Sequence, residues 1–258
     1  MKLTFLGTGT SFGIPVPGCG CAVCTSDDPR NQRTRHGLLL EQGGRRLLVD
    51  TPPELRLQLV RAGVDGLDGV FITHPHADHV HGIDDLRAFT AHADDRLPVH
   101  LAAEYEDEMK RRFHYIWGDE VRLNPGTTAP RLNLTTFEDR DRVRAAGLDL
   151  EVVAFPHGWF RSYGFRAGEV AVIVDAKRVP EDAMELLTGV RVLVINALWF
   201  GRPHPTHFNV EEAVETARAL EAESTYLTHL THRLDHADLE SRLPAGVQPA
   251  YDGLTIEV

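Results

Sequence analysis

Short apolar runs bounded by glycine, proline and polar residues recur along the chain, a pattern typical of β-strands separated by turns. The leucine-rich runs 38–40 and 47–49 are joined across Gln42-Gly43-Gly44-Arg45, which predicts a β-hairpin. The apolar runs 70–72 and 170–174 each stop at polar residues, and the mixed segments 148–156 and 224–228 are each followed by a histidine. We therefore expect strands whose ends carry side chains with chemical functions.

Helices are expected between these strands. Residues 51–54 have the spacing of a capping box with an early proline, and the helix that they start should end near Ala62-Gly63. A second helix is predicted from His81 to Phe89. Residues 209–212 have the Asn-x-x-Glu form of a capping box, for a helix that runs through Leu220. Strands and helices together are compatible with one large α/β domain or two small ones.

Potential metal ligands crowd directly after the run 70–72, and they are His74, His76, Asp78 and His79. Neutral imidazoles and carboxylates suit divalent metals such as zinc. One ion cannot easily take all four groups, because alternate residues of an extended backbone point in different directions. The spacing indicates two neighbouring ions, His74 and His76 on one and Asp78 and His79 on the other. The alternative is a histidine-rich surface loop in a chain with 14 histidines.

The spacing His-x-His-x-Asp-His resembles the signature of the metallo-β-lactamase superfamily at every position, and the resemblance extends along nearly the whole chain. It implies an α/β fold, the four-layer αββα sandwich, with residues 1–258 as a single domain. It also implies three later ligands at strand ends. His157 would complete the first site, His229 the second, and the Asp175 carboxylate would bridge the two ions. Taken singly, such residues are usually turn or surface groups.

The cysteines Cys19, Cys21 and Cys24 are the only ones in the chain and are spaced Cys-x-Cys-x-x-Cys. A disulfide framework would leave one thiol over and would require a tight ring. In a cytosolic protein such a cluster more often binds metal, and a closed tetrahedral zinc site needs a fourth ligand. His232 is the candidate. The alternative is a set of reduced thiols without metal.

Three features together resemble the PhnP branch of the superfamily: Gly7-Thr8-Gly9-Thr10-Ser11, the cysteine cluster and the histidine motif. The best-known members of that branch are cyclic phosphodiesterases. The resemblance implies a structural zinc on the three cysteines and His232, and two active-site ions, zinc or manganese, with iron also open. Such ions, roughly 3.5–4 Å apart, would share a hydroxide that attacks phosphorus. The glycine-rich loop lacks the Lys-Ser/Thr ending of a P-loop, so a tight turn is expected there.

The segment 202–213 places His204 and His207 just ahead of the helix predicted after Asn209. In phosphodiesterase branches of the superfamily, a histidine in a similar motif is thought to protonate the departing oxygen. An unperturbed imidazole titrates near about pH 6.5 and suits this task, since an alkoxide leaves poorly without a proton. We therefore predict His207 as general acid, with Asp78, a ligand of the second ion, as the other catalytic residue. Surface positions for His204 and His207 are the alternative.

Charge and hydropathy restrict the expected binding partners and cellular location. The formal net charge of −11 disfavours broad contact with nucleic acid. No apolar run is long enough for a membrane span, and the N-terminus turns too early for a signal peptide, so we expect a cytoplasmic protein without a membrane partner. The aromatic group 114–117 could pack in the core, roof the site or form a homodimer interface. Asp50 could orient a ligand histidine or serve a turn.

The expected function is that of a phosphodiesterase with two metal ions and a small phosphodiester substrate. Ribose 1,2-cyclic phosphate and 2′,3′-cyclic nucleotides are candidates, and residues 90–147 or 159–161 should discriminate among them. One alternative is a tRNA 3′-end endonuclease, which the acidic balance disfavours. Another is an iron-dependent oxidative enzyme like the quinone-cofactor biosynthesis relative, which departs from the full histidine motif. A non-catalytic metal-stabilised binding module is the third.

Overall fold

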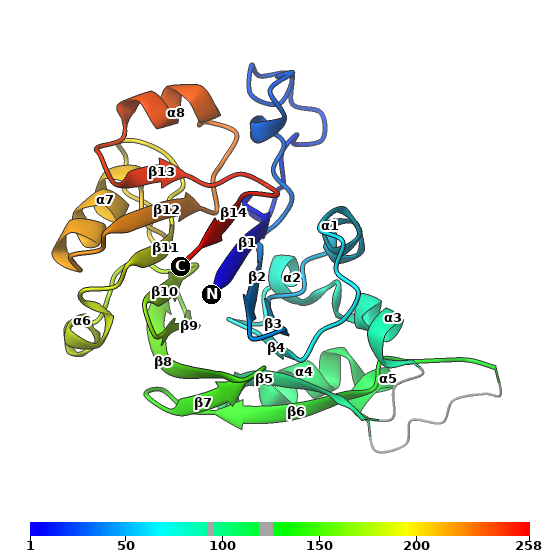
Figure 1. The fold of residues 1–258 in the computed structure, drawn as a ribbon. Helices are drawn as coiled ribbons and strands as arrows, with labels where there is room; N and C mark the ends of the chain where they lie inside the picture. Colours follow the sequence, from blue (N-terminus) through cyan, green and yellow to red (C-terminus); the bar gives the residue numbers. More distant parts are fainter. Residues whose placement is uncertain (92–94, 119–125) are drawn as a thin grey trace.

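Two β-sheets lie face to face in the computed structural model, which describes residues 1–91, 95–118 and 126–258. Helices cover the outer side of each sheet, so that the molecule has four layers in the order helix, sheet, sheet, helix (Figure 1). The α/β class and the αββα sandwich predicted from the sequence are confirmed.

In the part of the chain that the structure describes, each sheet has seven strands. The first sheet contains, in spatial order, β14 (Thr255–Glu257), β1 (Lys2–Gly7), β2 (Gly37–Gln42), β3 (Arg45–Val49), β4 (Gly69–Phe71), β5 (Leu97–Ala102) and β6 (Leu132–Phe137). The second sheet contains, in spatial order, β13 (Val247–Pro249), β12 (Ser224–Thr228), β11 (Val192–Asn196), β10 (Val170–Ile173), β9 (Phe160–Ala167), β8 (Leu148–His157) and β7 (Arg142–Ala145). Strands β3 to β6 run parallel, as do β10 to β13, whereas the remaining pairs are antiparallel.

Alternation along the strands builds two core layers. In β10, Val170 and Val172 belong to the core cluster shared with the first sheet, whereas Ala171 and Ile173 belong to the cluster shared with the helices of the second sheet. This is the two-residue period of a strand that is buried on both faces. The predicted hairpin at 38–49 is confirmed as the antiparallel pair β2–β3.

The helices are short and occupy the connections. They are α1 (Leu55–Arg61), α2 (Ala77–Val80), α3 (Arg87–Thr90), α4 (Glu106–Arg112), α5 (His114–Trp117), α6 (Glu181–Leu187), α7 (Val210–Ala219) and α8 (His236–Arg242), with 3-10 turns η1 (Pro29–Asn31), η2 (Ile83–Leu86) and η3 (Ala103–Tyr105). Within the described ranges, no helix combines the length and apolar character needed to cross a bilayer.

The capping box predicted at 209–212 is confirmed. The backbone N–H of Glu212 donates to Asn209 Oδ1 (2.8 Å), and the N–H of Asn209 donates to Glu212 Oε2 (3.0 Å). The box predicted at 51–54 is wrong. Helix α1 starts at Leu55 without a side-chain cap, because the Thr51 hydroxyl donates to the carbonyl of His79 (3.3 Å) instead.

The helix predicted over 81–89 is also wrong in its bounds. The first helical turn, α2, begins at Ala77, and the chain breaks at Gly82 before it continues as η2 and α3. Gly82 packs so closely on the loop before α1 that an added Cβ would lie 2.0 Å from the Pro52 carbonyl oxygen, and its N–H donates to the carbonyl of Thr51 (2.8 Å). This close approach interrupts the helix.

The aromatic group at 114–117 forms α5. Ile116 is buried and Trp117 packs partly against the same core, as the core-packing interpretation predicts, whereas Tyr115 remains 36% exposed. Of the region 90–147, which was predicted to help discriminate among substrates, residues 92–94 and 119–125 lie outside the described residues.

Candidate metal centre and active site

The predicted ligands come from loops at the ends of four strands that approach one another between the two sheets. The motif loop follows β4, His157 is the last residue of β8, and Asp175 and His229 follow β10 and β12. Asp175 and His229 have φ values of 54° and 56°, a backbone region that side-chain-bearing residues rarely adopt. Strain of this kind persists where surrounding structure enforces it, and it often marks functional sites.

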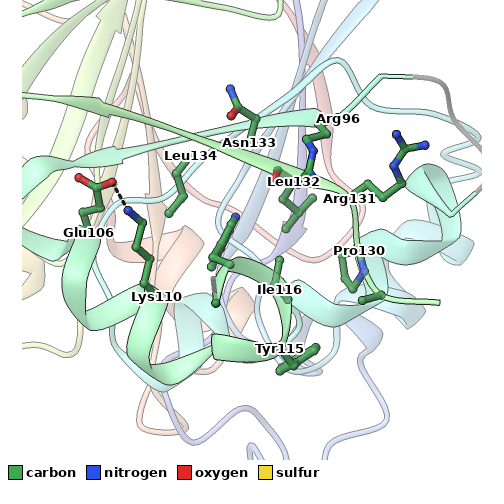
Figure 2. Close-up of a pocket in the computed structure, with 13 residues that line it drawn as sticks. Arg96, Glu106, Lys110, Tyr115, Ile116, Pro130, Arg131, Leu132, Asn133 and Leu134 are labelled. Atoms are coloured by element: carbon green, nitrogen blue, oxygen red, sulfur yellow. Dashed lines mark hydrogen bonds and ion pairs between the residues drawn. The ribbon is translucent and has the colours of Figure 1, made fainter. Parts of the chain in front are cut away.

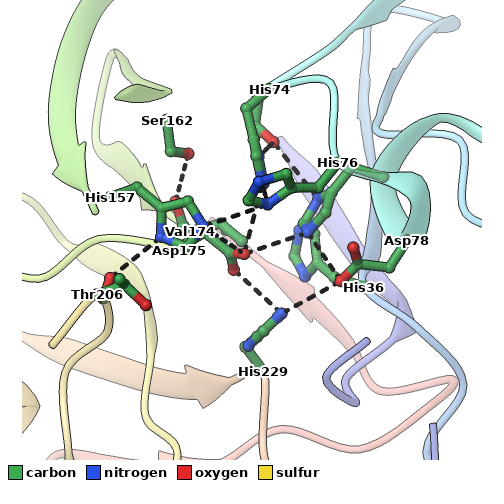
Figure 3. Close-up of polar contacts among 12 residues, drawn as sticks. His36, His74, His76, Asp78, His157, Ser162, Val174, Asp175, Thr206 and His229 are labelled. Carbon is green, nitrogen blue, oxygen red and sulfur yellow. Dashed lines mark hydrogen bonds and ion pairs between the residues drawn. The ribbon is translucent and has the colours of Figure 1, made fainter. Parts of the chain in front are cut away.

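The first group contains His74, His76, His157 and Asp175, whose ligand atoms all lie within 4.8 Å of one another. His76 Nδ1 lies 2.8 Å from His74 Nε2 and 3.3 Å from His157 Nε2. Asp175 Oδ2 lies 3.6 Å and 3.7 Å from the same two Nε2 atoms (Figure 3). Ligand atoms about 2.0–2.1 Å from a tetrahedral zinc ion are about 3.3 Å apart, so these spacings match a single ion.

The second group contains Asp78, His79, His229 and again Asp175. His79 Nε2 lies 3.4 Å from both Asp78 Oδ2 and Asp175 Oδ2. His229 Nε2 lies 3.1 Å from Asp175 Oδ1 and 3.8 Å from Asp78 Oδ2. Asp175 is therefore the residue that the two groups share. The division of the motif into two pairs, and the places of the three later residues, are those expected from the sequence.

The donor set fits divalent cations. The buried atoms His79 Nε2, Asp175 Oδ1 and His229 Nε2 form no hydrogen bond with the described part of the chain. Leaving buried polar atoms unsatisfied costs free energy, and in native proteins such atoms usually have a partner. Because these three residues belong to a group whose ligand atoms lie within 4.8 Å of one another, divalent ions are the partners that suit their imidazoles and carboxylate.

The electrostatics of the two groups differ. Burial, with the neighbouring His79, holds the pKa of His74 well below its ordinary value. Burial opposes the charge on His79 as well, but the carboxylates of Asp50, Asp78 and Asp175 outweigh it and raise the pKa of His79 well above the ordinary value. For Asp175, burial alone would raise the pKa. The surrounding histidines, His229 first, outweigh burial and lower the pKa well below its usual range. The second group therefore combines two carboxylates of its own, Asp78 and Asp175, with that of Asp50 beside His79.

Asp50 and Thr73 contact one histidine of each ligand group through the ring nitrogen Nδ1. His79 Nδ1 lies 2.6 Å from Asp50 Oδ2, which agrees with the orienting role considered for Asp50. The Thr73 hydroxyl lies 2.9 Å from Asp50 Oδ2 and 3.0 Å from His74 Nδ1. One buried carboxylate and one hydroxyl thus orient a histidine of each group.

Thr73 and His36 were not identified in the sequence analysis. His36 is fully buried, its ring centroid lies 5.8 Å from that of His79, and neither of its ring nitrogens has a hydrogen bond in the described part of the chain. The predicted hairpin contained a signal for it, because the pairing of Leu38 with Val49 brings the residue before β2 close to Asp50. Thr73 could have been found as the residue between the strand and the motif.

His207 lies beside both groups without belonging to either. Its Nε2 lies 3.3 Å from Asp175 Oδ2, and its ring stacks on His229 with centroids 5.0 Å apart. The Thr206 hydroxyl lies 2.8 Å from His207 Nδ1, and the Thr206 carbonyl lies 3.1 Å from His157 Nδ1. His204 Nδ1 is 3.2 Å from His207 Nδ1. Neither histidine is the isolated surface group considered as the alternative.

The three cysteines and His232 form a separate cluster. The distances from His232 Nδ1 are 3.4 Å to Cys19 Sγ and 3.6 Å to both Cys21 Sγ and Cys24 Sγ. In a tetrahedral zinc site the sulfur–nitrogen separation is about 3.5 Å. All three thiols are free of disulfides. A hydrogen bond from the backbone N–H of Cys24 lowers the pKa of Cys21 to about 6, whereas burial raises the pKa of Cys24 to about 11.

A hollow of about 600 Å³ lies elsewhere, between β6 and the pair α4–α5. Figure 2 shows its lining, which includes the ion pair of Glu106 with Lys110 (2.7 Å) and the side chains of Tyr115 and Ile116. The described lining contains no residue of the three ligand clusters. The chemistry is therefore concentrated at the strand ends and not in this hollow.

Comparison with known proteins agrees with this geometry. The sequence model of the β-lactamase superfamily domain matches residues 45–230. A crystal structure described as a new diphosphatase from the PhnP family is 35% identical, with a TM-score of 0.90, over 100% of this chain and 97% of that one. This chain belongs to the metallo-β-lactamase superfamily, in its PhnP branch. The prediction of an enzyme of the metal-dependent hydrolase class is thereby confirmed.

Other similar proteins are named for different activities. An octanoyltransferase of Porphyromonas gingivalis is 36% identical over 98% of this chain and 51% of its own length. A ribonuclease Z of Bradyrhizobium is 29% identical over 64% of this chain and 48% of its own length. The chain thus spans about half the length of these two curated relatives. Zinc-bound PqqB of Methylobacterium extorquens shares the fold at 19% identity, with a TM-score of 0.80 and complete coverage of both chains.

Proposed function

We propose that this chain is a phosphodiesterase that uses two divalent ions, zinc or manganese, to hydrolyse small phosphodiesters such as ribose 1,2-cyclic phosphate or 2′,3′-cyclic nucleotides. The observation that carries the proposal is the position of His207. It lies 3.3 Å from the carboxylate shared by two ligand groups, and it is a member of neither. A free imidazole in that place suits a reaction whose leaving oxygen needs a proton.

The first ion would be held by His74, His76 and His157, the second by Asp78, His79 and His229, and Asp175 would contact both. When bound, the ions would polarise the phosphoryl oxygens and make water a better nucleophile at neutral pH.

The residues around the centre would orient and transfer protons. The Thr206 hydroxyl fixes His207 through Nδ1, which leaves Nε2 directed at the centre as the proton donor to the departing oxygen. Asp50 and Thr73 keep His79 and His74 in their orientations. His207 contributes most when the leaving group is an alkoxide, because an alkoxide without a proton leaves poorly.

Several further assignments belong to the same proposal. Cys19, Cys21, Cys24 and His232 would hold a structural zinc, since four protein ligands leave no open position for a substrate. Three free thiols suit the reducing cytoplasm. The ligands come from both halves of the chain, which supports residues 1–258 acting as one hydrolase domain. A small phosphodiester is the partner, and the net charge of −11 argues against nucleic acid as substrate and so against a tRNA endonuclease.

The test compares two substrates with the variant His207→Ala. We expect its kcat on an alkyl-leaving-group diester to fall by about 10²–10⁴-fold, while a nitrophenyl diester loses much less because its leaving group needs little protonation. Metal content should not change, and His204→Ala serves as the neighbouring control. Equal losses on the two substrates would rule out the general-acid role. A panel of phosphodiesters assayed with zinc, manganese or iron added to stripped protein then identifies substrate and metal.

A second candidate function is supported by the 35% identity to a PhnP-family diphosphatase. Hydrolysis of a diphosphate would need the same two ions, but the departing phosphate is a good leaving group. In that case His207→Ala should have little effect on turnover of the physiological substrate. The same variant therefore separates a diesterase from a diphosphatase.

A further inference from the structure

We propose that Trp159 and Phe160 form an aromatic platform that binds a planar group of the substrate, a nucleobase, at the mouth of the metal centre. This inference rests on the proposed function and names the substrate class of the same site. It favours 2′,3′-cyclic nucleotides over cyclic phosphates that have no base.

The platform lies in the turn between β8 and β9. The last residue of β8, His157, pairs with the first residue of β9, Phe160, and Gly158 and Trp159 connect them. The Phe160 ring packs against His76 with centroids 4.9 Å apart and an interplanar angle of 72°. One aromatic ring of the turn thus contacts a proposed metal ligand, and Trp159 precedes it in the same turn.

The turn is fixed in position and is not a loose tip. Gly158 has φ +64°, and a Cβ added to it would lie 2.8 Å from Thr206 Cγ2. The neighbouring His157 is bonded through Nδ1 to the Thr206 carbonyl. Because Thr206 also contacts His207, the platform and the predicted proton donor are held by the same segment.

Trp159 is the most exposed of the large hydrophobic residues in the described chain, at 102% relative exposure, and Phe160 is 41% exposed. Tryptophan is highly buried on average, because its large apolar surface is unfavourable in water. Neither side chain fills a place in the two core clusters. An exposed indole on a fixed turn beside a metal centre is therefore surface available for stacking.

The charges around the site favour a neutral planar group over a second phosphate. Arg161, next to the platform, is 2.9 Å from Glu104, and Lys177, two residues after Asp175, is 2.7 Å from Glu212. Arg112, which donates to the carbonyl of Pro75 in the motif loop, pairs with Glu108. These three cations are already neutralised by carboxylates. Stacking of a base on an aromatic side chain needs no cation and contributes about 1–3 kcal/mol per base.

The experiment measures selectivity as the ratio of kcat/KM for 2′,3′-cyclic AMP to kcat/KM for ribose 1,2-cyclic phosphate. We expect Trp159→Ala to reduce this ratio by about 5- to 150-fold, which corresponds to the loss of one stacked base. Trp159→Phe should restore most of the ratio, because phenylalanine also presents an aromatic face. Leu57→Ala is the matched control, since Leu57 is another exposed apolar residue (56%) that lies on α1.

If Trp159→Ala leaves the ratio of the two kcat/KM values unchanged, the aromatic platform is wrong. If the protein still hydrolyses either diester, the proposed function is not contradicted by that result. If Trp159→Ala shifts the sedimentation coefficient from dimer to monomer without changing the ratio, the indole is a subunit contact and the inference is wrong.

If the wild-type protein cleaves neither diester, the proposed function fails, and binding then tests the platform separately. Calorimetry of metal-loaded protein should show tighter binding of AMP than of ribose 5-phosphate, with the difference lost in Trp159→Ala. Equal affinities for the two ligands in the wild-type protein would contradict the inference.

Discussion

The histidine–aspartate centre and the cysteine cluster each take one histidine from the same short segment, but they are built differently. His229 belongs to the histidine–aspartate centre and His232, three residues later, belongs to the cysteine cluster. The first centre gathers residues from four strand ends, most of them buried, and shares Asp175 between two groups. The cysteine cluster uses one loop and one histidine, and its members are only half-buried. A shared carboxylate beside a free histidine indicates reactivity, whereas a closed set of four ligands indicates structural support.

The segment between the two histidines connects them. The N–H of Leu230 donates to the Thr8 carbonyl (2.8 Å), and the Thr231 hydroxyl donates to the Leu198 carbonyl (2.6 Å). Arg233 lies over the Trp199 ring at 4.7 Å, at the start of the loop that leads to His207. A change in the cysteine cluster should therefore reach the active centre only indirectly.

The largest effect is expected from Asp175→Ala, because this residue belongs to both groups. Its removal should cost both ions and lower kcat/KM by roughly 10³-fold or more, since the charge that develops in the transition state loses its stabilisation. Elemental analysis should find only the zinc of the cysteine cluster. Retention of both active-site ions in this variant would show that Asp175 does not bridge them.

A smaller loss is expected from Asp50→Asn, which preserves size but removes the charge behind His79. Replacing a residue that hydrogen-bonds to a metal ligand typically lowers metal affinity or activity by about 10–100-fold. Titration with zinc should therefore show weaker binding of the second ion while the cysteine cluster keeps its affinity. Equal weakening at both clusters would point to a general loss of folding instead.

The pH dependence of zinc binding should distinguish the cysteine cluster from the first ligand group. The pKa of Cys24 is raised to about 11 by burial, so at pH 7–9 the thiol is protonated and zinc must displace the proton. The pKa of His157, lowered to about 4 by burial, leaves that imidazole of the first group neutral over the same range. The pKa of His79 is raised well above its ordinary value, so an ion at the second group also displaces a proton. Zinc affinity of the cysteine cluster should thus rise by at least about tenfold per pH unit. A chelator competition series that gives a pH-independent affinity would contradict this.

The smallest effect on turnover is expected from Cys21→Ser. The variant should lose the zinc of the cysteine cluster and unfold at a lower temperature, while both active-site ions remain. Coupling through the segment 229–233 should lower kcat by about threefold to tenfold, within the range typical of remote sites. A loss as large as that of Asp175→Ala would show that the cysteine cluster takes part in catalysis.

The sequence was sufficient for the features that depend on local spacing. The hairpin at 38–49, the capping box at Asn209 and the division of the motif into two pairs follow from periodicity, side-chain caps and alternation along the backbone. The places of His157, Asp175 and His229 depended on the resemblance to the superfamily, because single residues at strand ends carry no distinctive pattern.

Features that depend on tertiary contact could not be predicted. Thr51 has the spacing of a capping residue in the sequence, but its hydroxyl donates a hydrogen bond to the carbonyl of His79. The helix at 81–89 is broken where Gly82 meets Pro52, a contact between segments thirty residues apart. His36 has no motif of its own. The predicted hairpin places it near Asp50, but its burial beside His79 also requires the tertiary fold.

The most direct test is anomalous X-ray diffraction from crystals of the zinc-loaded protein. Two peaks about 3.5–4 Å apart should lie on either side of Asp175, one among His74, His76 and His157 and the other among Asp78, His79 and His229. A third peak should lie at the cysteine cluster. A single peak at the centre, or peaks remote from Asp175, would contradict the assignment of a shared carboxylate between two ions.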